Sequence, residues 1–253
     1  MMKKVFFVSD VHLGFFPRKR DRIRETMLVR CLQSIKDECG RLVIVGDFFD
    51  YWFDWGEVIP KYFYRTLAVL ADFRESGIEI DYLMGNHDFG HRNFFAEELD
   101  ITIYPDSIER EFFGKKFFIY HGDGLAYHDK PYLLLKKVLR NKTNLKLYTC
   151  LIHPDCALRM ASNFSVSSRQ TTSNPTRYGP KDGMLDFAIS KLQSGFDYVI
   201  MGHRHVLSEN RFDDGVYINL GDWFSTPGFG VFDESGFRFV SAENILNRYE
   251  EKK

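Results

Sequence analysis

Short apolar runs that end in or beside Asp, His or Gly alternate with longer segments of helical character along this chain. The runs are Val5–Val8, Leu42–Val45, Ile78–Met84, Phe117–Tyr120 and Asp197–Met201. Runs this short and this rich in β-branched and aromatic residues are typical of buried strands. The alternation therefore predicts a layered α/β fold.

Two of the intervening segments carry apolar residues at helical spacing. The first holds Ile23, Met27, Leu28, Cys31, Leu32 and Ile35, and the second holds Tyr62, Phe63, Leu67, Leu70 and Phe73. We expect these faces to cover the sheet. After Gly202, short strands with turn signals at 213–215 and 233–236 predict an antiparallel second sheet packed on the first.

Charge is segregated along the chain, although the 34 basic and 35 acidic residues of its 253 nearly cancel. The balanced total gives no reason to expect nucleic-acid binding. Residues 125–185 alone hold ten basic and three acidic residues, a local charge of +7, together with apolar stretches of helical character. We interpret residues 125–185 as an inserted helical lid, and residues 1–124 and 186–253 as the core domain.

Membrane-spanning segments and structural cysteine sites are not expected. The longest run without a charged residue, Trp223 to Phe232, has ten residues, whereas a spanning helix needs roughly 20. The apolar run Val5–Val8 is too short for a signal peptide, so we expect a cytoplasmic protein. The four cysteines lack metal-site spacing and are expected to be buried thiols.

Five blocks of metal-capable side chains lie at the ends of the predicted strands or beside them. They are Asp10-Val11-His12, Gly46-Asp47, Gly85-Asn86-His87-Asp88, His121-Gly122-Asp123 and Gly202-His203-Arg204-His205. The D-x-H and H-x-H spacing places alternate side chains on one side of an extended backbone, and glycine permits tight turns beside a site. Imidazole combined with carboxylate suits Mn²⁺, Fe or Zn²⁺. The blocks therefore predict a metal site.

The order D-x-H, GD, GNHD, H and GH-x-H resembles that of the calcineurin-like metallophosphoesterases. The resemblance covers Asp10 to His205 and implies a β-sandwich of two mixed sheets flanked by helices, with two divalent cations. It assigns one cation to Asp10, His12, Asp47 and His205, and the other to Asp47, Asn86, His121 and His203, so that Asp47 bridges. It also implies a catalytic role for His87 and Asp88, with His87 acting on the leaving group or on a phosphate oxygen.

Four of the blocks are also similar to those of the UDP-2,3-diacylglucosamine pyrophosphohydrolases, lipid A pathway enzymes that carry a helical lid. This resemblance implies hydrolysis of a lipid-linked sugar nucleotide, UDP-2,3-diacylglucosamine, to UMP and 2,3-diacylglucosamine 1-phosphate. It implies Mn²⁺ as the metal and a peripheral position on the cytoplasmic face of the inner membrane. It places substrate contacts at Asn86, His87, Asp129, Ser168 and Arg169. The cations and apolar faces of the lid would meet diphosphate, anionic headgroups and acyl chains.

Two other functions stay open at this point. His87 stands where many of those enzymes have Arg, as in general phosphoesterases, which leaves a soluble phosphodiesterase or phosphomonoesterase as the alternative. A metal-free binding scaffold would have lost ligands, whereas every expected ligand is present. The long basic and apolar insertion after His121 favours the lipid-linked substrate, because a soluble phosphoesterase is expected to have a short polar loop there.

Overall fold

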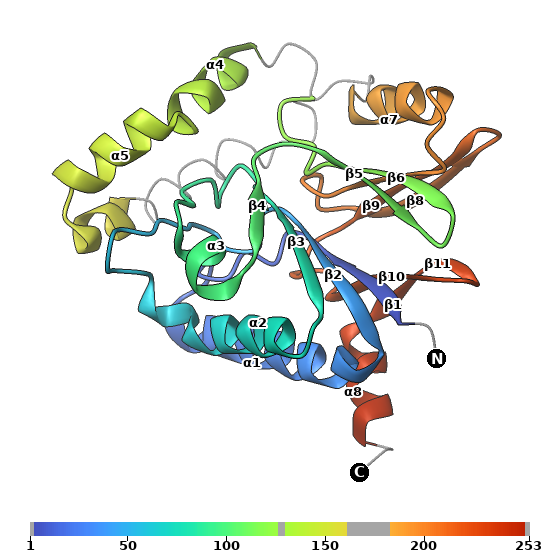
Figure 1. Cartoon of the computed structure of the whole chain (residues 1–253), viewed down its shortest axis with the longest axis horizontal. Helices are drawn as coiled ribbons and strands as arrows, with labels where there is room; N and C mark the ends of the chain where they lie inside the picture. The colour runs from blue at the N-terminus through green and yellow to red at the C-terminus, as the bar shows by residue number, and fades with distance from the viewer. Residues whose placement is uncertain (1–2, 126–129, 161–182, 251–253) are drawn as a thin grey trace.

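Two mixed β-sheets packed face to face form the centre of the molecule, and helices cover their outer faces (Figure 1). The computed structural model describes residues 3–125, 130–160 and 183–250. The layered α/β architecture predicted from the strand-like runs is confirmed.

The first sheet has the order β11-β10-β1-β2-β3-β4. Its strands are β1 (Lys4–Val8), β2 (Cys39–Val45), β3 (Glu79–Leu83), β4 (Thr102–Tyr104), β10 (Gly228–Asp233) and β11 (Gly236–Ser241). Strands β1 to β4 are parallel, while β10 and β11 add an antiparallel edge. Parallel strands are buried on both faces, which explains why β1 and β2 are unbroken apolar runs rather than alternating ones.

The second sheet has the order β5-β6-β7-β9-β8. Its strands are β5 (Ile108–Phe112), β6 (Lys115–Ile119), β7 (Tyr198–Met201), β8 (Leu207–Phe212) and β9 (Gly215–Leu220). The strands after Gly202 do not form one antiparallel sheet as expected. Instead β9 pairs in parallel with β7, and β10 returns to the first sheet beside β1. This return ties the two sheets together through the last third of the chain.

Three apolar layers hold these elements in place. Alternate residues of β1 point to opposite faces, so that Phe7 packs between the sheets and Phe6 packs outward against the helices. The outer face of the first sheet is covered by α1 (Arg18–Ile35), α2 (Tyr64–Glu75), α3 (Phe94–Leu99) and α8 (Ala242–Glu250), with short 3₁₀ turns at Lys36–Glu38 and Lys61–Phe63. The outer face of the second sheet is covered by α7 (Gly183–Gln193).

The sequence correctly predicts which residues of α1 and α2 are buried along most of each helix, but the prediction is wrong around the N-terminus of each helix. Leu28 and Leu32 are fully buried, but Ile23 is 68% exposed and Tyr62, just before α2, is 43% exposed. In the first turns of α1 the buried face carries Asp21 and Glu25 instead, at 2% and 1% exposure. Apolar residues therefore point outward at this end of the molecule.

Two further helices, α4 (Lys130–Leu139) and α5 (Lys142–Leu151), stand away from the sheets in the region expected to be a lid (Figure 1). Asn141 caps α5 by accepting hydrogen bonds from the backbone amides of Thr143 and Asn144. The return to the core comes slightly before the expected residue 186, because α7 already begins at Gly183 and Met184 packs against the second sheet. The division into core and lid remains a prediction.

The remaining expectations concern cysteines and membrane spans. Cys31 and Cys39 are buried thiols as predicted, but Cys150 and Cys156 are exposed. Across the described ranges, none of the helices combines the length and apolar character needed to cross a membrane.

Candidate metal centre

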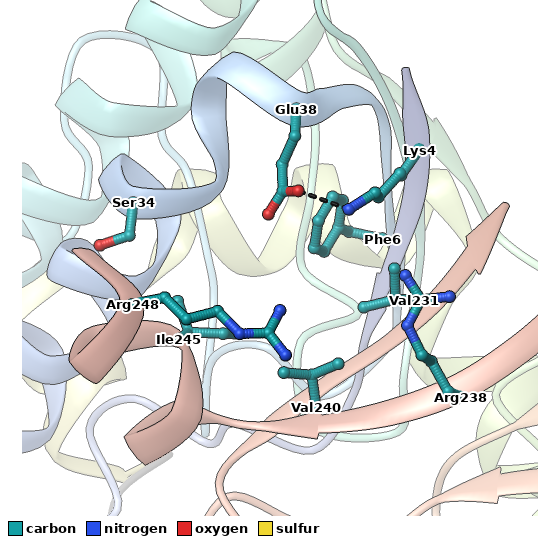
Figure 2. A pocket seen from close by; sticks show the side chains of 9 residues that line it. All are labelled: Lys4, Phe6, Ser34, Glu38, Val231, Arg238, Val240, Ile245 and Arg248. Atoms are coloured by element: carbon teal, nitrogen blue, oxygen red, sulfur yellow. Dashed lines mark hydrogen bonds and ion pairs between the residues drawn. The ribbon is translucent and has the colours of Figure 1, made fainter. Parts of the chain in front are cut away.

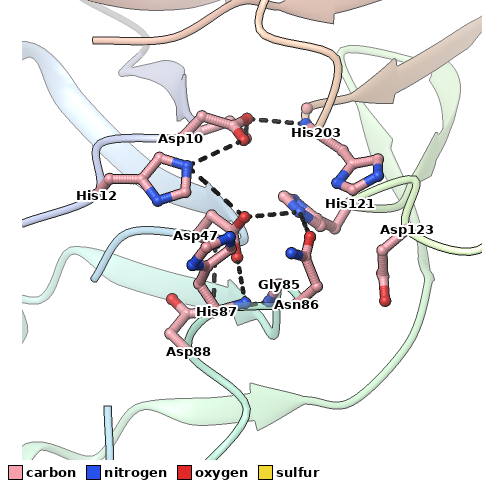
Figure 3. A network of polar contacts seen from close by, with 12 residues as sticks. Asp10, His12, Asp47, Gly85, Asn86, His87, Asp88, His121, Asp123 and His203 are labelled. Atoms are coloured by element: carbon pink, nitrogen blue, oxygen red, sulfur yellow. Dashed lines mark hydrogen bonds and ion pairs between the residues drawn. The ribbon is translucent and has the colours of Figure 1, made fainter. Parts of the chain in front are cut away.

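The metal-capable blocks come together beyond the carboxyl ends of five strands. Asp10 and His12 follow β1, Asp47 follows β2, Asn86 follows β3, His121 follows β6, and His203 and His205 follow β7. Because β1, β2 and β3 are neighbouring parallel strands, the loops that follow them meet at one edge of the first sheet. Figure 3 shows the side chains from both sheets converging on this edge.

Seven candidate ligands form two groups on either side of Asp47. In the first group, Asp10 Oδ1 lies 3.2 Å from His205 Nε2 and 3.8 Å from His12 Nε2. Asp47 Oδ2 lies 3.7 Å from His12 Nε2 and 3.3 Å from His121 Nε2. The carboxylate of Asp47 is therefore close to histidines of both groups.

Asn86 and His203 complete the second group. Asn86 Oδ1 lies 3.2 Å from His121 Nε2. Ligand atoms of Asp47, His121 and His203 all lie within 4.8 Å of one another, as do those of Asp10, His12 and His205. The structure thus brings together all seven residues singled out from the sequence.

This donor set fits divalent cations. Asp10 Oδ1 is buried and has no hydrogen-bond partner among the described residues, although His205 Nε2 lies at 3.2 Å outside hydrogen-bond geometry. A buried carboxylate oxygen without a donor is costly, and a cation would satisfy it. Imidazole nitrogens with carboxylate and amide oxygens suit Mn²⁺, Fe or Zn²⁺, whereas soft metals such as Cu(I) prefer thiolate ligands.

Five of the seven candidate ligands have a left-handed backbone. Their φ angles are +49° at Asp10, +48° at His12, +50° at Asp47, +66° at His203 and +59° at His205. Such angles are uncommon for residues other than glycine and cost about 1–3 kcal/mol each. Strain of this kind is retained at functional sites when the surrounding structure enforces it. Backbone hydrogen bonds between the loops, such as His12 N–H to Asp47 O at 2.9 Å, provide that enforcement.

Close approach of the backbone explains two of the glycines in the motifs. A Cβ atom at Gly85 would lie 2.0 Å from Asp47 Oδ1, and a Cβ at Gly202 would lie 1.9 Å from Ser9 Oγ and 2.4 Å from Asp10 Oδ2. Any other residue would displace the carboxylates, so glycine is required here by packing against the site.

Asp88 supports the site from behind rather than facing its centre. Its two oxygens accept hydrogen bonds from the backbone amides of Asp47, Phe48 and Gly85 and from the hydroxyl of Tyr82. Burial and the charge of Asp47 raise the pKa of Asp88 to about 6. These contacts join the loops after β2 and β3, so Asp88 is a positioning residue in this structure.

Further carboxylates orient the histidines. Asp50 Oδ1 lies 3.2 Å from His12 Nδ1, and Asp222 Oδ2 lies 3.6 Å from His205 Nδ1. Carboxylates behind ligating imidazoles fix the ring orientation and the tautomer. Asp222 was missed in the sequence, although Gly221-Asp222 follows β9 in the same way that Gly46-Asp47 follows β2.

The electrostatics of the cluster are those of tightly paired opposite charges. Burial lowers the pKa of His12, but its contacts with Asp10 and Asp50 reverse this and raise it to about 10. The pKa of His121 is likewise raised to about 10 by Asp47 despite burial. Burial, and then the neighbouring charge of His121, lower the pKa of His203 to about 4.

His87 lies at the accessible side of the cluster. Its side chain is 17% exposed, its ring centroid lies 4.8 Å from that of His12, and its backbone amide donates to Asp47 Oδ1 at 2.8 Å. This position allows the imidazole to reach a molecule that enters from solvent. Asp129, Ser168 and Arg169, the other residues expected to contact substrate, lie outside the described residues.

An aromatic group that the sequence reasoning missed also contacts His12. The Phe224 ring stacks on His12 with centroids 5.5 Å apart, and Phe15 lies 4.5 Å from Phe224. Phe16 lies 5.6 Å from Phe224 and carries the guanidinium of Arg20 over its face at 3.8 Å. The first turns of α1 are therefore connected to the metal-capable cluster through aromatic contacts.

Ion pairs attach α4 and the residue that follows it, Arg140, to Asp123, directly beside the metal-capable cluster. Asp123 Oδ2 lies 2.9 Å from Lys136 Nζ and 3.0 Å from Arg140 Nη2. Arg140 also donates to the carbonyl oxygens of Gly85 and Pro105. Burial raises the pKa of Asp123, but the charges of Arg140, His121 and Lys136 lower it to about 2.

These contacts change one expectation about the lid. The cations of residues 125–185 were expected to meet diphosphate and anionic headgroups, but the side chains of Lys136 and Arg140 are only 12% and 11% exposed and contact Asp123 instead. A second attachment is apolar: Leu145 and Tyr148 of α5 pack with Phe53, Trp55 and Phe89. The exposed side chains of α4 and α5 include Lys137 and Lys146 but also large apolar ones, with Leu134 at 67% and Leu151 at 73% exposure.

A separate small pocket has no connection with this chemistry. It has a volume of about 90 Å³ and lies among α1, α8 and the β1, β10 and β11 strands, with Lys4 paired to Glu38 at 2.6 Å (Figure 2). None of the candidate ligands lines it.

Comparison with known proteins agrees with the geometry. A family model described as calcineurin-like phosphoesterase matches residues 3–207. A protein of Porphyromonas gingivalis named UDP-2,3-diacylglucosamine hydrolase is 28% identical, with 97% of this chain and all of the relative covered. A protein of the same name from Neisseria meningitidis serogroup B is also 28% identical over 88% of this chain and 90% of the relative. A solved archaeal phosphodiesterase aligns with a TM-score of 0.46 at 18% identity, covering 94% of this chain and 99% of that one.

The match to the family model spans most of the chain and includes every candidate ligand from Asp10 to His205. The chain belongs to the calcineurin-like phosphoesterase family of metal-dependent hydrolases.

Proposed function

We propose that this protein hydrolyses the diphosphate bond of UDP-2,3-diacylglucosamine, giving UMP and 2,3-diacylglucosamine 1-phosphate. The observation that carries the proposal is the convergence of two metal-capable groups on Asp47 beside a lid with an exposed apolar surface. The names of the Porphyromonas and Neisseria relatives support this substrate over other phosphate esters.

We assign Asp10, His12, Asp47 and His205 to one cation and Asp47, Asn86, His121 and His203 to the other, and we take Mn²⁺ as the metal. Bound divalent cations supply Lewis-acid activation of the phosphoryl group and of a water nucleophile. The ligands of this chain fix where those charges sit, because their loops are braced by Asp88, Asp50 and Asp222. Such bracing reduces reorganisation during the reaction.

His87 has the position required of a residue that acts on the substrate. Its amide is held by Asp47 Oδ1 and its imidazole is partly exposed beside His12. We assign it to a non-bridging phosphate oxygen or to the departing oxygen, where an imidazole N–H can donate a hydrogen bond or a proton. Asn86, beside it, would share the contact with phosphate.

The lid gives the proposal its preference for an acylated substrate. Leu133 and Leu134 are 41% and 67% exposed, and Leu147 and Leu151 on α5 are 56% and 73% exposed. Acyl chains would cover these side chains, and each methylene removed from water contributes about 0.8 kcal/mol. A lipid-linked substrate also requires that the protein work at a membrane surface, here the cytoplasmic face of the inner membrane.

The test is release of UMP from UDP-2,3-diacylglucosamine by the Mn²⁺-loaded protein, compared with the deacylated UDP-sugar and with p-nitrophenyl phosphate esters. We expect a large preference in kcat/KM for the diacylated substrate, reduced in a variant with Leu133→Ser and Leu134→Ser. Equal rates on both UDP-sugars, or turnover of the simple esters alone, would leave a soluble phosphodiesterase as the better account.

A further inference from the structure

A basic and aromatic surface covers the beginnings of α1 and α2, outside the metal centre. We call it the α1–α2 surface and define it by Arg18, Lys19, Arg22, Ile23, Lys61, Tyr62, Tyr64 and Arg65. Its members contact one another across the two helices. The guanidinium of Arg18 lies 4.6 Å from the ring centre of Tyr62, and Tyr64 Oη accepts hydrogen bonds from Arg65 Nε at 3.2 Å and Arg22 Nη1 at 3.5 Å.

The large side chains of this surface are in water. Ile23 is 68% exposed, Tyr64 54% and Tyr62 43%. The spacing of apolar residues predicted that Ile23 and Tyr62 would be buried against the sheet, and both are exposed instead. Isolated exposed apolar residues are ordinary, but here they are interleaved with cations, and Lys19 and Lys61 are exposed beside them.

The acidic residues of the same segment are buried. Asp21 is 2% exposed and accepts a hydrogen bond from the Gly14 amide at 2.8 Å, while Glu25 is 1% exposed and lies beside Thr66 and 3.8 Å from Arg22 Nε. The outward face of α1 therefore presents its cations without exposed acids from its own first two turns. Hydrogen bonds from Arg65 and Arg22 lower the pKa of Tyr64, as expected where positive charge is concentrated.

We propose that the α1–α2 surface docks the protein on the anionic headgroups of a phospholipid membrane. Arginine and lysine side chains are attracted to an anionic leaflet, tyrosine is favoured at the boundary between headgroups and water, and an exposed isoleucine can enter the acyl region. Interleaved cations and amphipathic rings are the composition that such a boundary accommodates.

The position of the surface fits this role. Arg20, on the same turns of α1, lies over Phe16, and Phe16 contacts Phe224, which stacks on His12. Docking through α1 and α2 would thus hold the rim of the metal centre close to the membrane. In Figure 1 the first turns of both helices lie at the side of the molecule toward which α5 also extends. The functional value of docking rests on the proposed lipid-linked substrate, but docking itself does not require turnover.

The test is flotation of the whole protein with vesicles of phosphatidylcholine alone and with vesicles that also contain phosphatidylglycerol. A charge variant carries Arg18→Gln, Lys19→Gln and Lys61→Gln, and its matched control carries Arg30→Gln, Lys115→Gln and Arg211→Gln. Each basic residue near an anionic leaflet strengthens binding about fivefold, so the charge variant should lose roughly 100-fold in affinity for the anionic vesicles. The control should bind like the wild type. Ile23→Ser should also weaken vesicle binding, and because this loss is apolar it should be the same at low and high salt.

Equal vesicle binding by the charge variant and its control would overturn the proposal and assign membrane contact to the lid. Binding of a single-stranded RNA by this surface, without binding of anionic vesicles, would overturn it in favour of nucleic acid. Turnover of substrate presented in detergent micelles separates the two proposals: the charge variant should retain it. A protein that docks but releases no UMP would contradict the proposed reaction and leave the docking surface standing.

Discussion

The attachment of α4 to the core makes a quantitative prediction for Arg140→Ala. The substitution removes a cation from Asp123, which is fully buried and which Lys136 also contacts, and removes a donor from the carbonyl oxygens of Gly85 and Pro105. Breaking a buried ion pair costs about 3–5 kcal/mol, and because Lys136 remains on Asp123 we expect the lower end, about 3 kcal/mol. Arg140 is only 11% exposed, so solvent screens the pair weakly.

The cost should appear in the local opening of α4 rather than in unfolding of the two sheets. About 3 kcal/mol corresponds to roughly 100-fold faster hydrogen exchange for those amides of α4 that exchange through local opening of the helix. Hydrogen exchange followed by mass spectrometry measures this directly, with Lys137→Ala as the matched control, because Lys137 is exposed on the same helix. Exchange in α4 that is the same in both variants would refute the attachment.

Three further substitutions have expected outcomes. His91 stacks on Trp52 and burial lowers its pKa to about 3 from its usual 6.5, so protonation of the unfolded chain removes stability as pH falls from 6.5 towards 3, by up to about 1.4 kcal/mol per pH unit. His91→Phe should abolish this slope in urea unfolding at several pH values, and an unchanged slope would disprove the assignment. Asp47→Ala should leave less than about a tenth of kcat, a barrier increase above roughly 1.4 kcal/mol, with circular dichroism unchanged; greater residual activity would place the chemistry elsewhere. Gly85→Ala should weaken Mn²⁺ binding in calorimetry because its Cβ overlaps Asp47 Oδ1, and wild-type affinity would contradict that overlap.

The strands and the candidate ligands were predictable because both depend on local pattern. Unbroken apolar runs indicate parallel strands, and the residues that follow them meet at the sheet edge whatever the intervening helices do. His121 and His203 belong to the second sheet, and their convergence with Asp47 follows from the family resemblance rather than from spacing.

The orientation of surface charges was not predictable in the same way. Lys136 and Arg140 are one helical turn apart and look like an exposed basic stripe, but Asp123 turns them inward. Conversely, Ile23 lies opposite the buried stripe formed by Leu28 and Leu32, because Asp21 occupies the inner face to brace the Gly14 loop. In both cases a partner distant in the sequence determines which way the side chain points. The periodicity of a single segment carries no information about such partners.

The left-handed backbone of the ligands was also invisible in the sequence. Asp and His adopt such angles more often than most residues other than glycine, but still uncommonly. At His12 and Asp47 the tertiary hydrogen bonds between the loops, such as His12 N–H to Asp47 O, enforce them. Sequence rules fail here at the functional site, which is where local preference is expected to be overridden.

The central claim is that Asp47 joins two cations held by residues of both sheets. Anomalous scattering at the manganese edge from crystals of the Mn²⁺-loaded, active protein tests it most directly. The account predicts two peaks roughly 3.5–4 Å apart, each within bonding distance of Asp47, with His12 and His205 on one and His121 and His203 on the other. A single peak, or two peaks that do not both contact Asp47, would contradict it.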